Sequence, residues 1–269
     1  MSSYFITGVS KGLGLALVRL LASNPSNIVL GLARDMEATE KKLAGDGFKN
    51  VHILSGDITD EKALQTAATE AEKILGDKGL DVMINNAGYI SDITSLESIR
   101  DLENDKELLI QDIYKSFDVN AVGTLKAVYA FLPLVRKGTQ KKIVAISSGM
   151  GDVDFINDAK VFGSVPYGIS KAALNILMAK LNVAYQDEGI LCIAICPGEI
   201  SRDTPPTFND EQMAKVMKIV SVFRGYAPNY ESYDPPTAAK NVMAAIDRSS
   251  LEAGFGGSFL SHNGTKKWM

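Results

Sequence analysis

A tyrosine and a lysine in the segment Tyr167–Lys171 have the types and spacing for acid–base chemistry. The residues that follow form helices well, so both side chains are expected on one helical face, at positions i and i+4. Free tyrosine, with a pKa of about 10, is a poor acid or base at neutral pH, and a nearby ammonium would lower that pKa. The pair could then exchange a proton with a carbonyl and alcohol couple. Taken alone, the spacing is more typical of an ordinary surface pair.

A glycine-rich turn, Thr7–Gly14, lies between an expected strand and an expected helix, Gly14–Ser23. Glycine permits a tight turn and a close approach of the backbone to a phosphate, and the helix N-terminus adds free N–H groups. This position in a βαβ unit suits a dinucleotide, although the glycine spacing differs from G-x-G-x-x-G. Lys11 precedes Gly12, so the turn is not a P-loop. A turn without a ligand is the alternative.

The second expected strand ends at Ala33, Arg34 and Asp35, where the adenosine ribose of a dinucleotide would be recognised. A carboxylate there favours a free 2′-hydroxyl, and an arginine favours a 2′-phosphate. Because Lys11 in the glycine turn could approach the same phosphate, two cations against one carboxylate favour NADP(H). The alternative is that Arg34 and Lys11 are solvated surface charges.

Apolar runs that alternate with helical patterns predict a parallel sheet, because parallel strands need long crossovers. The expected strands are Tyr4–Thr7, Ile28–Ala33, Val51–Ser55, Leu80–Asn85, Lys142–Ser147, Leu191–Cys196 and Gly257–Leu260, and one expected helix is Glu61–Leu75. The prediction is a single α/β domain over residues 1–269, a doubly wound parallel sheet of about seven strands with helices on both faces. The stretch from Pro197 to about Tyr233 is the least regular, and residues 201–235 are expected to form a lid.

Composition narrows the class of protein. The chain has 269 residues, 46% hydrophobic and 22% charged, with a net charge of −4, which argues against binding a nucleic-acid backbone. No apolar run reaches the length of about 18 residues needed to cross a bilayer, and the start has no charged leader, so a cytoplasmic location is expected. Cys192 and Cys196 are expected to be buried free thiols, His52 and His262 structural or surface residues, and no metal site is expected.

Several polar groups follow the expected strands at the sheet edge where α/β proteins bind ligands. They are Asn85–Gly88, Ser147, Ser148 and the Pro197–Gly198 pair, with Asn120 in a helical stretch. Three motifs occur in the order, and at the approximate spacing, that is typical of one protein family. They are T-G-x-x-x-G-x-G at Thr7–Gly14, N-N-A-G at Asn85–Gly88 and Y-x-x-x-K at Tyr167–Lys171. The chain resembles the short-chain dehydrogenase/reductases, one-domain Rossmann proteins, over nearly its whole length. It looks most like sniffer-like carbonyl reductases and related fungal ketoreductases.

The resemblance implies four catalytic roles. Tyr167 would be the general acid in reduction and the base in oxidation, and Lys171 would lower the Tyr167 pKa and hold the nicotinamide ribose. Ser148, rather than Ser147, would hydrogen-bond the substrate oxygen, because it directly precedes the Gly-Met-Gly turn. Asn120 would anchor a water that links Lys171 to solvent.

The resemblance also implies a set of cofactor contacts. Asp57 would bind the adenine amino group with help from the Ile58 backbone, and Ile200 would contact the carboxamide through its backbone. The full expected set is Gly8, Ser10, Lys11, Gly12, Leu13, Gly14, Arg34, Asp57, Ile58, Asn86, Ala87, Gly88, Tyr167, Lys171, Pro197, Gly198 and Ile200.

Two departures from the family pattern affect these expectations. Arg202 stands where a threonine is frequent, with Ser201 and Thr204 nearby. Ser148 and Tyr167 are 19 residues apart, more than is usual in the family. The extra stretch, Asp152–Val165, is expected to loop out and border the substrate, and a displaced Ser148 would remove the serine assignment.

The sequence thus predicts an enzyme that reduces a ketone or aldehyde, a small-molecule carbonyl substrate, with NADPH rather than NADH. An NAD-dependent alcohol dehydrogenase and a non-catalytic dinucleotide-binding regulatory protein are the alternatives. The oligomeric state stays open between monomer, homodimer and homotetramer.

Overall fold

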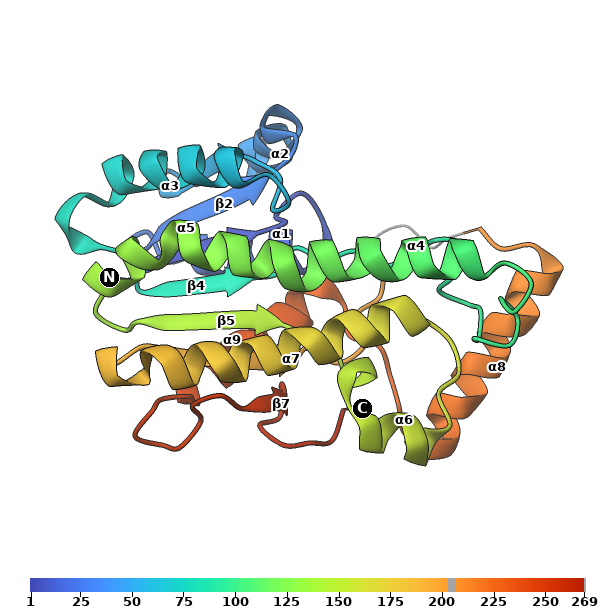
Figure 1. The fold of residues 1–269 in the computed structure, drawn as a ribbon. Helices are drawn as coiled ribbons and strands as arrows, with labels where there is room; N and C mark the ends of the chain where they lie inside the picture. Colours follow the sequence, from blue (N-terminus) through green and yellow to red (C-terminus); the bar gives the residue numbers. More distant parts are fainter. Residues whose placement is uncertain (203–206, 269) are drawn as a thin grey trace.

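The computed structural model describes residues 1–202 and 207–268. Its centre is one seven-stranded parallel sheet in the order β3-β2-β1-β4-β5-β6-β7 (Figure 1). The strands are β1 (Ser3–Thr7), β2 (Ile28–Ala33), β3 (Val51–Ser55), β4 (Val82–Asn85), β5 (Lys142–Ile146), β6 (Leu191–Cys196) and β7 (Phe259–Ser261). All seven expected strands are present within two residues of their expected ends, and the predicted doubly wound fold is confirmed.

Helices cover both faces of the sheet because each strand presents apolar side chains to both sides. One face packs against α1 (Gly12–Ala22), α2 (Met36–Leu43) and α9 (Pro235–Arg248). The other packs against α3 (Glu61–Leu75), α5 (Gly123–Lys137) and α7 (Val165–Tyr185), and α4 (Lys106–Phe117) lies beside α7.

Two segments expected to be irregular contain helices. The stretch before Tyr167 forms α6 (Val153–Ala159), capped by the Asp152 side chain, and the lid segment forms α8 (Asp210–Tyr226). A capping box between Asn209 and Gln212 begins α8, and no residue of α8 is fully buried. Because α8 does not pack on the sheet, its sequence lacks the broad apolar stripe from which a buried helix is predicted.

From β1 the chain first adds β2 and β3 on one side, and it then returns to place β4 on the other side of β1. Ligands of open α/β sheets bind outside the carboxyl ends of the strands at this switch point. In Figure 1 the strand arrowheads point toward the side where α6 and α8 lie. The fold therefore indicates a binding site at the carboxyl ends of the strands.

Candidate active site

The glycine turn after β1 is closely packed at Gly14 and has open space beside Gly12. A Cβ on Gly14 would lie 2.2 Å from the Gly8 carbonyl oxygen, so the side-chain-free residue lets α1 approach the turn. Gly12 has a φ of +56°, and a Cβ there would have no neighbour within 4 Å. The Lys11 side chain does not cap α1. An open glycine turn at a helix N-terminus fits a pyrophosphate group.

The segment after β4 is tied directly to this turn. The Thr7 hydroxyl accepts hydrogen bonds from the backbone N–H groups of Asn86 (3.0 Å) and Ala87 (2.9 Å). The Asn86 amide donates in return to the carbonyl oxygens of Thr7 (2.9 Å) and Gly8 (3.0 Å). Asn86, Ala87 and the glycine turn are therefore one rigid unit across the switch point.

The charges at the end of β2 are not equivalent. Asp35 caps α2 and accepts a hydrogen bond from the Ala38 N–H at 2.9 Å, so its carboxylate is engaged. The Arg34 side chain is 82% exposed and lies 3.9 Å from Asp57, a weak pairing. Lys11 is also exposed. A phosphate at this corner would meet available cations and an occupied carboxylate.

Asp57 and Ile58 follow β3 at the same edge. Asp57 accepts hydrogen bonds from the backbone N–H (2.9 Å) and hydroxyl (2.8 Å) of Thr59, which fix its orientation. Ile58 is buried against Gly123 at the start of α5. Both residues therefore occupy defined positions beside Arg34 and the first turn of α5.

Ser148 and Tyr167 are neighbours despite the 19 residues between them. The Ser148 hydroxyl hydrogen-bonds the Tyr167 phenol, and it accepts from the Met150 N–H (3.2 Å) in the 149–151 turn. The Ser147 hydroxyl donates instead to Asn175 at 2.6 Å. The extra residues fold into α6 and leave Ser148 in place, which favours Ser148 over Ser147 as the residue facing a substrate.

Lys171 is buried and donates from Nζ to the Ile146 carbonyl oxygen at 2.8 Å, while Nζ lies 5.5 Å from the Tyr167 ring centroid. Burial lowers the pKa of Lys171 to about 8. The Tyr167 pKa rises to about 12, because desolvation outweighs the hydrogen bond from Ser148. The expected lowering of the Tyr167 pKa by Lys171 is therefore wrong for this structure, in which the ammonium faces a backbone carbonyl.

Asn120 lies within a π-helical turn, Asp118–Val122, that joins α4 to α5. Its side chain accepts from the Tyr89 N–H (2.7 Å) and donates to the Tyr89 carbonyl (2.9 Å) and the Ser170 hydroxyl (2.8 Å). Asn120 thus ties the segment after β4 to α7, one residue before Lys171. Its link to solvent through a water stays a prediction.

A cleft of about 480 Å³ opens above Ser148 and Tyr167. Much of its apolar wall comes from the segment after β4, the 149–161 region and α8. The described lining side chains that are large and apolar are Leu13, Ile90, Leu96, Ile146, Met150, Phe155, Val161, Ile200, Ile219, Phe223 and Trp268. Ser164, with a φ of +56°, is held at the cleft wall by a 2.8 Å hydrogen bond to the Ser95 carbonyl. The arrangement can bind a mostly apolar molecule against a tyrosine and a serine hydroxyl.

The segment after β6 contributes the residues that depart from the family pattern. Pro197, Gly198, Ile200 and Arg202 line the cleft. The Ser201 hydroxyl is engaged by the Tyr233 carbonyl at 3.2 Å. Thr204 lies outside the described residues. Among the described candidates, no free hydroxyl replaces the frequent threonine.

Three residues of this site were missed from the sequence. The Cys196 sulfur accepts a hydrogen bond from the Gly149 N–H at 3.3 Å, beside the Ser148 turn. Trp268 is buried against Gly149 and stacks on Phe259. Glu199 lines the cleft. Only the position of Glu199, next to the Pro197–Gly198 pair, could have identified it in advance.

The cysteine and histidine side chains, which could in principle bind a metal ion, do not form a cluster in the described part of the chain. Cys192 and Cys196 are buried free thiols, as expected. His262 is buried and packs edge-on against Tyr233, and His52 is half-buried on β3. Within the described ranges, no three His, Cys, Asp or Glu side chains gather as metal ligands would. The same part of the chain contains no helix of sufficient length and apolar character to span a membrane.

Comparisons with known proteins agree with this geometry. A family model described as short chain dehydrogenase matches residues 3–213. The chain is 39% identical to the short-chain dehydrogenase/reductase iacC of Pestalotiopsis fici and 40% identical to the short chain dehydrogenase virK of Hypocrea virens, each time over all of both chains. Among solved structures, it resembles the carbonyl reductase Sniffer of D. melanogaster with a TM-score of 0.77 and 25% identity, over 98% of each chain.

Proposed function

The chain belongs to the short-chain dehydrogenase family, and we propose that it reduces a ketone or aldehyde to an alcohol with NADPH. The observation that carries this proposal is the hydrogen-bonded pair of Ser148 and Tyr167 at the base of an apolar cleft, beside an open glycine turn. A module that only binds a dinucleotide needs no such pair.

When bound, the nicotinamide cofactor supplies the hydride. Tyr167 gives its phenolic proton to the carbonyl oxygen, and the Ser148 hydroxyl stabilises the negative charge that develops there. Because burial raises its pKa to about 12, Tyr167 keeps its proton at neutral pH, and this proton is available to the developing alkoxide, which is a stronger base than a phenolate. Lys171 holds the nicotinamide ribose, and Asn120 positions the segment that faces Lys171.

The preference for NADPH is supported by the charges at the end of β2. Arg34 and Lys11 are exposed, whereas Asp35 is engaged in capping α2. The same preference agrees with the NADPH named for a carbonyl reductase from chicken fatty liver, which has this fold. Gly8, Ser10, Gly12, Leu13 and Gly14 would carry the pyrophosphate.

The first experiment follows the loss of absorbance of the reduced nicotinamide. Purified protein is supplied with NADPH or NADH and a panel of diketones, quinones, aromatic ketones and aldehydes. We expect oxidation of NADPH with one carbonyl class, much faster than oxidation of NADH. The Tyr167→Phe variant should lose about a thousandfold in kcat and keep its NADPH affinity. Unchanged turnover in Tyr167→Phe would reject the acid role.

The cofactor preference has a separate test in Arg34→Asp. The new carboxylate would repel a 2′-phosphate and accept a hydrogen bond from a 2′-hydroxyl, so the variant should move toward NADH. We expect the ratio of kcat/KM for NADPH over NADH to fall at least tenfold. Exposed Lys49→Asp is a matched charge reversal away from the site, and its ratio should match the wild type. An unchanged ratio in Arg34→Asp would remove the role of Arg34.

The remaining proposals concern the substrate and the setting. A small-molecule carbonyl substrate would enter under residues 201–235, which we propose act as a lid.

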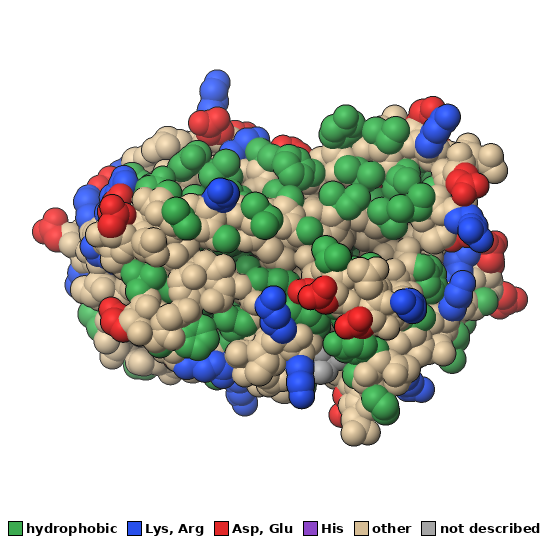
Figure 2. All heavy atoms as spheres, turned by 60° about the horizontal axis from the view of Figure 1, so that its bottom comes forward, with side chains coloured by type: hydrophobic (Ala, Val, Ile, Leu, Met, Phe, Trp, Pro, Cys, Tyr) green, Lys and Arg blue, Asp and Glu red, His purple; other side chains and the backbone are tan. Residues whose placement is uncertain are grey.

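Figure 2 shows hydrophobic side chains exposed on one face of the molecule, and exposed apolar residues on α4 and α7 include Ile110, Ile169 and Ile176. Such side chains suit self-association, which mass measurement in solution would detect. A cytoplasmic location stays a prediction.

A further inference from the structure

The cleft above Tyr167 has only one acidic side chain among its described lining residues, that of Glu199. Arg202 is the one described cation of the lining, and most of the remaining surface is apolar. A ligand that removed this carboxylate from water would have to offer it a hydrogen-bond partner. The role of Glu199 is not explained by the proton transfer proposed for Tyr167 and Ser148.

The backbone fixes where Glu199 stands. Gly198, with a φ of +81°, lies against Tyr233 and His262. The Tyr233 N–H donates to the Glu199 carbonyl at 2.8 Å, and the Ser201 N–H donates to the Tyr233 carbonyl at 2.8 Å. These bonds hold the chain on both sides of Glu199, so its carboxyl group is presented from a rigid support and not from a free loop.

The Glu199 side chain has no hydrogen-bond or ion-pair partner within the described part of the chain. The surrounding cleft raises its pKa by desolvation, and no charged neighbour offsets this effect. Glu199 is nevertheless an exposed residue, so its carboxylate is hydrated while the cleft is empty. It is therefore accessible to a ligand and could gain a hydrogen bond when a ligand displaces water.

The remaining walls define the rest of the ligand. A cleft of about 480 Å³ falls within the range of pockets that hold drug-sized molecules. Ile90 and Leu96 lie on one wall, and Ile219 and Phe223 of α8 lie on another. A carbonyl compound of two or three carbons would leave these side chains in contact with water, whereas a ring system would cover them.

We propose that Glu199 binds a hydroxyl group on the substrate and that this site selects ring-bearing, mostly apolar ketones that carry such a hydroxyl. The proposal rests on the proposed carbonyl reductase function, because it uses the same cleft. Glu199 acts here as a specificity-determining residue: it accepts a hydrogen bond at a distance from the carbon that receives hydride.

The test uses three sets of ketones: 1-tetralone, its four phenolic isomers, and the corresponding methoxy compounds, which cannot donate a hydrogen bond. For at least one phenolic isomer we expect a wild-type kcat/KM about tenfold above that of 1-tetralone, the effect of one hydrogen bond to a carboxylate. In Glu199→Leu this ratio should fall to about one, and in Glu199→Gln to an intermediate value. Glu231→Gln, an exposed residue of the same segment outside the cleft lining, should keep the wild-type ratio.

Two results would overturn the proposal. One is the same phenol-to-tetralone ratio in wild type and Glu199→Leu. The other is a loss in Glu199→Leu that is equal for all ketones and accompanied by weaker NADPH binding, which would assign Glu199 to the cofactor or to the fold.

A binding measurement separates this proposal from the reductase function. The chain has one tryptophan, Trp268, and it lies in the cleft, so its fluorescence reports occupancy without turnover. With NADP⁺ present, phenolic tetrahydronaphthols should bind the wild type about tenfold more tightly than tetralin, and Glu199→Leu should bind both alike. If no ketone is reduced but this difference persists, the specificity proposal stands while the reductase proposal fails. Equal binding of both ligands to the wild type overturns the specificity proposal.

Discussion

The cofactor half and the substrate half of this site are built in different ways. Around the glycine turn, the contacts are made by backbone groups and short side chains, such as Thr7 and Asn86, close to the ends of β1 and β4. Around the cleft, side chains from segments far apart in the chain meet, including Leu96, Phe155, Ile219 and Trp268. The first half is rigid because its parts are fixed to the sheet, and the second depends on how loops and outer helices pack.

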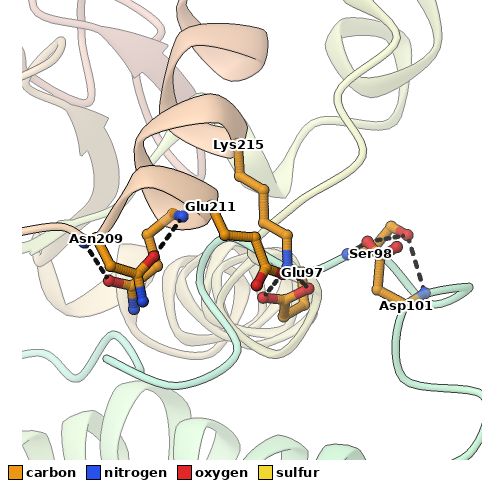
Figure 3. A network of polar contacts seen from close by, with 7 residues as sticks. Glu97, Ser98, Asp101, Asn209, Glu211 and Lys215 are labelled. Atoms are coloured by element: carbon orange, nitrogen blue, oxygen red, sulfur yellow. Dashed lines mark hydrogen bonds and ion pairs between the residues drawn. The ribbon is translucent and has the colours of Figure 1, made fainter.

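The substrate half compensates with polar contacts across its opening. Lys215 of α8 contacts both carboxylate oxygens of Glu97 at 2.8 Å, and it also pairs with Glu211 on its own helix at 3.1 Å (Figure 3). Glu97 follows Ser95 and Leu96 of the cleft wall, and Lys215 stands one turn before Ile219. This ion pair therefore joins two walls that the sheet does not hold together.

The largest effect is expected at Lys171, where the two halves meet. Below pH 8 its ammonium is charged in the folded and the unfolded chain, so the cost of burying it is present in full. Between pH 8 and 10.5 the folded protein loses this proton first, the unfolded chain binds more protons, and stability rises with pH. Relative to Lys171→Met, the wild type without cofactor should gain about 3 kcal/mol in free energy of unfolding across this range.

Denaturant titrations of both proteins at several pH values measure this gain. Lys180→Met removes an exposed lysine of the same helix, α7, so it serves as the control and should run parallel to the wild type. A gap between wild type and Lys171→Met that does not change with pH would mean that Lys171 is solvated and that the boundary between the halves is open to water.

A smaller effect is expected at Gly14 in the cofactor half. In Gly14→Ala the new Cβ would lie 2.2 Å from the Gly8 oxygen and 2.5 Å from the Asn86 amide nitrogen. The resulting displacement should cost about 2 kcal/mol of stability, more than alanine gains in helix propensity, and should weaken NADPH binding. Thermal unfolding and cofactor titration measure both effects. Gly45→Ala, whose Cβ would meet nothing within 4 Å, is the matched control. A stable Gly14→Ala with normal affinity would show that the cofactor half is not rigid.

The smallest effect is expected for the ion pair in the substrate half. A double-mutant cycle on Glu97→Gln and Lys215→Met should give a coupling free energy of about 0.5 kcal/mol, because the pair is partly exposed, and the coupling should fall with added salt. Removal of the Glu97–Lys215 pair should also change the KM for a bulky ketone. The bidentate Arg136–Glu188 pair lies outside the cleft lining, and its removal should leave KM unchanged. Equal KM changes for the two pairs would remove the distinction between the lid and the rest of the surface.

The elements that the sequence predicted best are those that pack on the sheet. The strands and α3 were found because buried strands are short apolar runs and α3 has an apolar stripe that faces the core. The helices α6 and α8 lie in segments that were expected to be irregular. They cover the cleft rather than the core, and each begins at a capping side chain, Asp152 for α6 and Asn209 for α8. The pKa of Tyr167 was predicted in the wrong direction, because burial cannot be read from the spacing to Lys171.

The amino-acid sequence by itself determined the sheet, the glycine turn and the residue types of the Ser148, Tyr167 and Lys171 set. Each of these follows from a local pattern, whether an apolar run, a glycine where backbone approaches backbone, or one helical turn. Only the tertiary structure showed that Asn175 engages the Ser147 hydroxyl while Ser148 faces Tyr167, and that Trp268 and Cys196 adjoin the Ser148 turn. It also showed that Glu199 is the one acidic residue in the described lining of the cleft. These facts depend on contacts between distant segments, and burial and charge at such contacts arise only once the chain has folded.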